Sequence, residues 1–230
     1  MLVSILLLTV AWAQDDARIT AKPDAVEPGE SATLTWTTTG QSAFLSGVGK
    51  VAVKGSASVS PRTSTEYTLV SEGPAGIKYA SVKVRVIGER GDIVFPDPSD
   101  FPKGVEGDRK SLGYPEFLDL VQATLQDKLK FRVRSEHGPR DNFYFFFTER
   151  APRPDLLRSS DRGIRSRRIT YAVRVDEPRA KSRNTHFEVK ALVEYQRLGE
   201  SMWRPETNQQ IVNDAMGELK SSLETLGPGH

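Results

Sequence analysis

Apolar and polar residues alternate with a period of two in several short stretches of the N-terminal third. The clearest stretch is 31–36, in which Ala32, Leu34 and Trp36 fall on one side of an extended chain. Residues 65–70 and 80–86 repeat this alternation, and turn-forming residues separate the stretches. The pattern predicts several short strands, which is typical of an all-β sandwich.

A helical pattern follows Pro115, a residue that suits the first turn of a helix. The apolar residues after it are three or four positions apart: Phe117, Leu118, Val121 and Leu125. Four stretches then favour strands, at 129–133, 142–148, 168–175 and 187–195. A last helix is expected after an N-cap at Thr207, with one apolar stripe: Val212, Ala215, Met216, Leu219, Leu223 and Leu226. This order predicts an α+β domain, with a four-stranded antiparallel sheet and both helices on one face.

The region between these patterns is rich in Gly, Pro and Asp, which do not favour a regular element. We therefore expect a linker at 91–113 between a sandwich domain at 14–90 and an α+β domain at 114–230. A chain of 230 residues has room for two modest domains. The expected fold class is multidomain, with an all-β sandwich followed by an α+β domain.

Three segments of the first domain resemble the bacterial immunoglobulin-like domains (PKD and Big types) of envelope and secreted proteins. They are residues 28–36 (PGESATLTW), 55–61 (GSASVSP) and 63–69 (TSTEYTL). The resemblance covers about the N-terminal third and implies an antiparallel immunoglobulin-like sandwich. It also implies that Tyr67 is a corner tyrosine, whose hydroxyl bonds the backbone in such folds. Such modules usually serve as spacers or adhesion units, although a fold does not by itself determine a function.

Residues 2–13 form an apolar run that ends in Ala11-Trp12-Ala13 and is followed by polar residues. This is the pattern of a signal peptide with a small-x-small cleavage site. The run is shorter than the roughly 20 residues that span a bilayer. No Lys or Arg precedes it, and a buried N-terminal strand is the alternative interpretation. We expect cleavage after Ala13 and export to the periplasm, the cell surface or the extracellular medium.

The composition argues against several classes of function. The chain has no cysteine, so disulfides, thiolate metal sites and cysteine nucleophiles are excluded. Its three histidines are not at zinc-ligand spacing, and it has no phosphate-binding glycine loop and no nucleophile elbow. A net charge of +2 provides no overall attraction to nucleic acid. We expect no catalytic residue, no metal, no cofactor and no nucleic-acid partner.

Arginines are concentrated between positions 150 and 183, where eleven Lys and Arg residues face four carboxylates. The guanidinium group suits bidentate contact with phosphate or carboxylate. We expect a basic loop that binds an anionic partner, formed by Arg158, Arg162, Arg165, Arg167 and Arg168. The partner would be an envelope protein, an anionic polymer or a lipid headgroup. The alternative is that these charges pair with the acidic C-terminal residues: Glu188, Glu194, Glu200, Glu206, Asp214, Glu218 and Glu224.

Two further features concern the C-terminal domain. Glu188 and Glu194 are an even number of residues apart in one strand, so we expect them to share a face and to pair with Arg168 or Arg174. Trp203 either stacks on a ligand or fixes a loop onto the core. The sequence therefore predicts an exported, envelope-associated interaction or structural protein without catalysis, which binds an anionic macromolecular partner. A glycan-binding protein and a carboxylate-dependent hydrolase are the alternatives.

Overall fold

The computed structural model describes residues 17–74, 76–87, 100–110, 112–138, 142–178 and 184–225. The expected signal peptide at 1–13 lies outside these ranges, as do residues 91–99 of the expected linker. The described chain is rich in β-strand, with several sheets and two α-helices.

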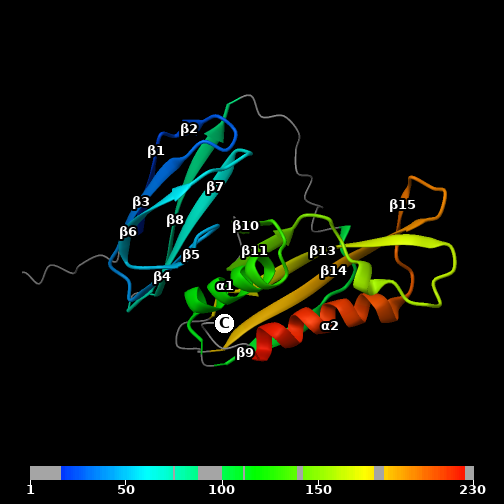
Figure 1. Ribbon diagram of the computed structural model, residues 1–230. Helices are drawn as coiled ribbons and strands as arrows, with labels where there is room; N and C mark the ends of the chain where they lie inside the picture. The colour runs from blue at the N-terminus through cyan, green and yellow to red at the C-terminus, as the bar shows by residue number, and fades with distance from the viewer. Residues whose placement is uncertain are drawn as a thin grey trace, which may run out of the picture.

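Residues 17–87, which we call the N-terminal part, form two β-sheets that share a core (Figure 1). The smaller sheet has the order β1 (Ala17–Lys22), β3 (Ala32–Thr38), β6 (Lys54–Val59). The larger sheet has the order β2 (Ala25–Val26), β8 (Gly76–Val86), β7 (Thr65–Gly73), β4 (Ser42–Leu45), β5 (Gly49–Val51). Neighbouring strands are antiparallel except β2 and β8, which are parallel.

The alternation in the sequence accounts for the core of the N-terminal part. In β3 every second residue is buried, and Ala32, Leu34 and Trp36 face inward. They pack against apolar residues of the second sheet, including Leu45 and Leu69, both fully buried. The strands expected at 31–36, 65–70 and 80–86 are therefore present, and their apolar faces hold the two sheets together.

Residues 100–225, the C-terminal part, contain a seven-stranded antiparallel sheet. Its centre is the long pair β13 (Ile164–Asp176) and β14 (Thr185–Arg197). On the side of β13 lie β10 (Val133–His137), β11 (Phe143–Thr148) and β12 (Ala151–Pro152). On the side of β14 lie β9 (Val105–Arg109) and β15 (Trp203–Pro205). Strand β10 is at the edge, because among the described residues it pairs only with β11.

Two helices cover one face of this sheet (Figure 1). Helix α1 (Tyr114–Ala123) continues into a π-helical turn (Thr124–Lys128), and α2 (Gln209–Thr225) follows the last strand; a short 3-10 turn (Pro154–Leu156) precedes β13. Phe117 of α1 packs on Phe187 with ring centroids 5.2 Å apart. Tyr171 of β13 donates its hydroxyl to the Ala215 carbonyl of α2 at 3.3 Å. The apolar side chains that the sequence pattern predicts for the inner faces of the helices, such as Val121 and Leu219, are buried against this face of the sheet.

The structure differs from the sequence expectations at four places. The C-terminal sheet has seven strands rather than the four expected, because the short strands β9, β12 and β15 also join it through backbone pairing. Residues 105–109 lie within the expected linker, yet they form β9; a Cβ at Gly107 would lie 2.5 Å from the Phe187 ring, so glycine permits this pairing. The strand expected at 129–133 begins only at Val133, because the preceding residues extend α1 as a π-turn. The N-cap of α2 is Asn208 rather than Thr207: the Gln210 N–H donates to Asn208 Oδ1 at 3.0 Å.

Direct contacts join the N-terminal and C-terminal parts. The Phe44 ring of β4 meets the rings of Tyr144 and Phe146 edge-on, with centroids 6.1 and 6.2 Å apart. The backbone N–H of Gly47 donates to Gln122 Oε1 at 3.0 Å, and that of Lys50 donates to Asp119 Oδ1 at 2.6 Å. These two acceptors lie on α1. The helix therefore holds β4 and its following turn in a fixed position relative to the C-terminal sheet.

Candidate functional site

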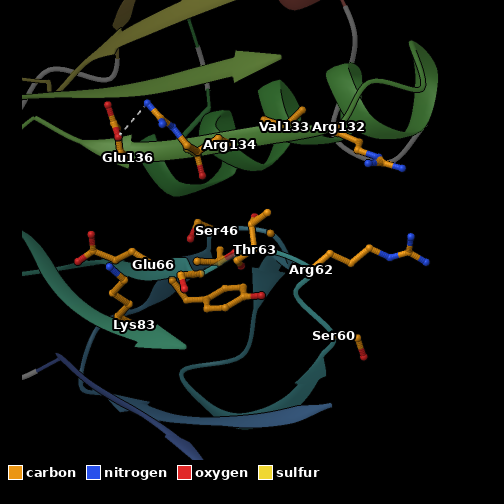
Figure 2. Close-up of a pocket in the computed structure, with 15 residues that line it drawn as sticks. Ser46, Ser60, Arg62, Thr63, Glu66, Lys83, Arg132, Val133, Arg134 and Glu136 are labelled. Carbon is orange, nitrogen blue, oxygen red and sulfur yellow. Dashed lines mark hydrogen bonds and ion pairs between the residues drawn. The ribbon is translucent and has the colours of Figure 1, made fainter. Parts of the chain in front are cut away.

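A groove of about 600 Å³ lies between the N-terminal part and strand β10 (Figure 2). We call it the β10 groove. One wall comes from the connections after β4 and β6 and from β7 and β8: Ser46, Gly47, Ser60, Arg62, Thr63, Ser64, Thr65, Glu66, Tyr67 and Lys83. The other wall is β10 with the residue before it: Arg132, Val133, Arg134, Ser135 and Glu136. Its volume is within the range of about 300–1,000 Å³ that is typical of ligand pockets.

The charged side chains of the β10 groove are exposed and mainly positive. Four cations line it, and two carboxylates accompany them: Arg62, Lys83, Arg132 and Arg134 against Glu66 and Glu136. Arg134 pairs with Glu136 at 3.4 Å, and Figure 2 shows both on the β10 wall, opposite Glu66 and Lys83. Arg62 has no ion pair among the described residues. An excess of one sign in a concave site attracts ligands of the opposite sign.

Hydroxyl groups fill much of the remaining lining: Ser46, Ser60, Thr63, Ser64, Thr65 and Ser135. Several of them are held by the surrounding structure. Ser46 Oγ accepts from the Thr68 N–H at 2.9 Å, and Ser64 Oγ accepts from the Val86 N–H at 3.0 Å. A hydroxyl both donates and accepts, so this lining can bond oxygen and nitrogen atoms of a ligand.

The backbone of β10 leaves one edge open along the groove. The Gly138 N–H donates to the Phe143 carbonyl at 3.1 Å, and the Glu149 N–H donates to the Arg132 carbonyl at 3.0 Å. In an antiparallel ladder, bonded and non-bonded pairs alternate. Positions 134 and 136 therefore bond β11, whereas the N–H and C=O of Val133 and Ser135 point away from it. Residues 132–136 all line the groove, although successive side chains of a strand point to opposite faces of the sheet. Such a set of residues lines one groove only where the groove runs along the edge of the strand, so the β10 groove follows this outer edge.

Tyr67, the corner tyrosine implied by the resemblance, is one of the residues that line the groove on the N-terminal wall. Its residue is 6% exposed, and burial raises its pKa to about 12. Its hydroxyl forms no hydrogen bond with the residues that the structure describes. The backbone bond expected for a corner tyrosine is therefore absent from this part of the chain.

Arg167, a member of the expected basic loop, is 2% exposed. Its Nε donates to Glu206 Oε2 at 2.8 Å, and its Nη1 donates to the Leu156 carbonyl at 2.9 Å and to Asp161. The hydrogen bond from Arg167 holds the pKa of Asp161 below its usual value. The guanidinium is thus enclosed by groups of the protein itself and stabilises the fold at this position.

Arg168 is also engaged within the protein. Its Nε and Nη2 donate to the two carboxylate oxygens of Glu194 at 2.8 and 3.0 Å. Its guanidinium carbon lies 4.2 Å from the centroid of the Trp203 ring. One face of Trp203, the expected stacking residue, is therefore covered by an arginine. This arrangement fixes β15 on the sheet.

The remaining members of the expected basic loop divide into two groups. Arg158 pairs with Asp214 of α2 at 2.8 Å. Arg162 and Arg165 are exposed and form no ion pair with a described residue. Pairing with the acidic C-terminal residues extends further along the segment, with Arg153–Glu218, Arg167–Glu206, Arg168–Glu194 and Arg174–Glu188. The last two pairs are those expected from the shared face of the two glutamates.

The histidines and carboxylates of the described residues offer no metal site. No group of three or more potential metal-ligating side chains occurs there. His186 pairs with Asp108 at 3.2 Å. His137 stacks on Tyr79 with ring centroids 4.0 Å apart, and burial lowers its pKa. Neither described helix has the length and apolar character needed to cross a membrane.

No family model matches the chain, and no curated sequence matches it. The candidate site thus depends on the geometry alone. Sequence reasoning missed the β10 groove because its two walls are far apart in the chain, at 46–83 and 132–136. The available signal was the alternation of Lys and Arg with apolar residues at 128–134. Charged side chains of this kind are typical of a strand at the edge of a sheet, but they do not identify the residues of the opposite wall.

Proposed function

We propose that this protein is an exported, non-catalytic binding protein of the cell envelope, which holds an anionic macromolecular partner in the β10 groove. The observation that carries the proposal is the excess of exposed cations in a groove that is also lined with hydroxyls. The proposed export rests on the apolar run at 2–13. We further propose an immunoglobulin-like sandwich for the N-terminal part and an α+β domain for the C-terminal part, which the shared core of two sheets and the two helices on one sheet face support.

The groove is a better candidate than the basic loop because its cations are less neutralised. In the loop, Arg158, Arg167 and Arg168 are bound to carboxylates within 2.8 Å or closer. In the groove, Arg62 and Lys83 have no ion pair among the described residues, and Arg132 has one at 3.9 Å to Glu149. An exposed pair at such a distance contributes little, so these charges stay available to a partner.

We also propose that the groove binds its partner without catalysing a reaction. The groove lining contains neither His nor Cys, and its two carboxylates are each beside a cation: Glu136 pairs with Arg134, and Glu66 is opposite Lys83 in the β7–β8 register. The lining therefore offers no imidazole or thiol for proton transfer or nucleophilic attack, and its charged groups suit electrostatic binding.

Co-sedimentation of residues 14–230 with isolated envelope fractions over a range of salt concentrations tests the proposal. A groove variant would carry Arg62→Ser, Lys83→Ser and Arg132→Ser. A loop variant with Arg162→Ser and Arg165→Ser is the matched control, because it removes exposed arginines elsewhere on the surface. We expect binding that falls with salt, is lost in the groove variant and persists in the loop variant.

Each other outcome of this experiment has a defined meaning. Loss of binding in the loop variant alone would show that the partner contacts Arg162 and Arg165 and not the groove. Binding that neither salt nor the groove variant affects would contradict an electrostatic contact in the groove. An unchanged unfolding transition in both variants would show that the effects arise from binding and not from the fold.

A further inference from the structure

The open edge of β10 offers a regular set of backbone groups. Val133 and Ser135 each direct one N–H and one C=O away from β11, on the side of the groove. No other strand of the described chain pairs with this edge. Unpaired strand edges are templates for another extended chain, and peptide ligands use them by adding a strand.

The length of this edge is limited at both ends. At one end the Tyr79 ring stacks on His137, so the N-terminal part covers the strand there. At the other end the next outward-facing position is Phe131, whose N–H already donates to the Leu125 carbonyl at 2.9 Å. The accessible section is therefore Val133–Ser135, which matches a short pairing rather than a long sheet extension.

The charges around this section define the chemistry of the added chain. Arg132 and Arg134 lie on the β10 wall, and Arg62 and Lys83 on the opposite wall. Side chains of a strand alternate between two sides, so acidic residues at every second position of an added strand would all point to the same side. An anionic polysaccharide carries charge but lacks the fixed alternation of donors and acceptors that a strand edge pairs with.

We propose that the partner is an extended acidic polypeptide segment that binds β10 as an added antiparallel strand, with its backbone on Val133 and Ser135 and its carboxylates on the groove cations. This inference rests on the proposed function, since it names the class of anionic partner that the same groove takes. The affinity comes from main-chain hydrogen bonds together with charge, and the selection of partners comes from the acidic side chains.

The direct test uses a fluorescent heptapeptide of alternating residues, Glu-Val-Glu-Thr-Glu-Val-Glu, with blocked ends. Two N-methylated forms serve as a matched pair: one is methylated at the glutamates and the other at the Val and Thr positions. Only one of these two sets can face β10, since successive residues of a strand point their backbone groups to opposite edges. We expect one methylated form to bind about tenfold more weakly and the other to bind within about twofold of the parent.

A variant of the protein tests the same contact from the other side. Ser135→Pro removes an N–H that faces the groove and takes no part in the β11 ladder. Ser135→Ala is its control, because it removes the side-chain hydroxyl and keeps the N–H. We expect Ser135→Pro to weaken peptide binding about tenfold and Ser135→Ala by no more than about twofold, with both proteins folded by circular dichroism.

The outcomes separate this inference from the proposed function. Equal binding of both methylated peptides overturns strand addition, while salt-sensitive binding that the groove variant abolishes would leave the proposed function standing. Binding of oligogalacturonate, an anionic glycan, without binding of the peptide also overturns it. An envelope contact that the groove variant does not affect is a failure of the proposed function itself.

Discussion

Arg167 is a charged residue in the interior, and its surroundings explain why an arginine occupies this position. Its guanidinium donates to Glu206 and to the Leu156 carbonyl, both within 2.9 Å, and it also donates to Asp161. A buried cation costs several kcal/mol unless its partners satisfy it. Here two carboxylates and a carbonyl, from the connection before β13 and from the residue after β15, converge on one planar group, which a lysine could not reproduce.

Removal of this guanidinium should destabilise the protein strongly. Arg167→Met leaves Asp161 and Glu206 without their cation, although their side chains are only 14% and 5% exposed. We expect the free energy of unfolding in urea to fall by about 3 kcal/mol. The exposed Arg162→Met is the control and should change it by less than about 0.5 kcal/mol. Similar small losses in both variants would show that Arg167 is not a structural residue.

Single residues also show what the sequence can predict about charges. The shared face of Glu188 and Glu194, and their pairing with Arg174 and Arg168, follow from the two-residue period of a strand. The acidic C-terminal residues could be named as possible partners of the other arginines. The assignment of Asp214 to Arg158 and of Glu206 to Arg167 could not be predicted, because only the tertiary fold brings these side chains together. A run of arginines in the sequence therefore predicts the local charge, but it does not predict how many of these arginines form ion pairs in the folded protein.

Strand β4 links the two parts through one aromatic side chain. Phe44 is fully buried and belongs to the N-terminal sheet, but its ring packs on Tyr144 and Phe146 of β11. The turn after β4 is fixed in addition by the bond from Gly47 to Gln122 of α1, and the next strand, β5, by the bond from Lys50 to Asp119. The shape of the β10 groove depends on this junction, since Ser46 and Gly47 of the same turn line it.

Truncation of Phe44 should therefore affect both stability and the groove. We expect Phe44→Ala to lower the free energy of unfolding by about 3–5 kcal/mol, because it leaves a cavity at the junction. It should also weaken envelope binding, since the two walls of the groove lose their fixed spacing. Val53→Ala, at a residue 37% exposed in the same part, is the control for unfolding in urea. A variant with normal stability and normal binding would contradict this role of the junction.

The elements that the sequence predicted best are those in which one hydrophobic period repeats over many residues. The stripes of α1 and α2 and the alternation in β3, β13 and β14 appear in the structure because many side chains share each pattern. The short strands β9, β12 and β15 have no such signal, since they contain five residues or fewer. Their backbone pairing to neighbouring strands, and not their own composition, defines them.

Buried tyrosines give the whole molecule a characteristic response to alkaline pH. Burial raises the pKa of Tyr67, Tyr144 and Tyr171 to about 12 each, and raises those of Tyr79 and Tyr114 as well. In the unfolded chain these groups titrate near pH 10. The stabilisation that the neutral phenols provide is thus complete below about pH 10 and is lost as the pH rises towards 12.

We expect little tyrosinate absorbance from the folded protein until about pH 11, and then a rise that coincides with unfolding. Ultraviolet difference spectra and circular dichroism recorded on the same samples measure both events. Protein unfolded in urea should instead titrate near pH 10. Full ionisation near pH 10 with native circular dichroism would contradict the burial of these rings.

At the scale of the whole molecule, sequence reasoning could identify the β-rich character and the two helices but not the site. The β10 groove exists only where residues 46–83 approach 132–136, and no local pattern encodes that approach. The basic loop was the visible feature of the sequence, yet ion pairs with distant carboxylates engage three of its five arginines. Anion binding remains the shared element of both interpretations.

Anion binding in the β10 groove is tested most directly by a map of backbone amide chemical shifts during titration with hexaglutamate, an anionic probe. We predict that the largest changes lie at residues 62–66, 83 and 132–136, which line the β10 groove. They should diminish with added salt, as expected for contacts between exposed charges. Changes centred instead on residues 158–168, with the groove amides unchanged, would contradict binding in the β10 groove and would place the binding site in the basic loop.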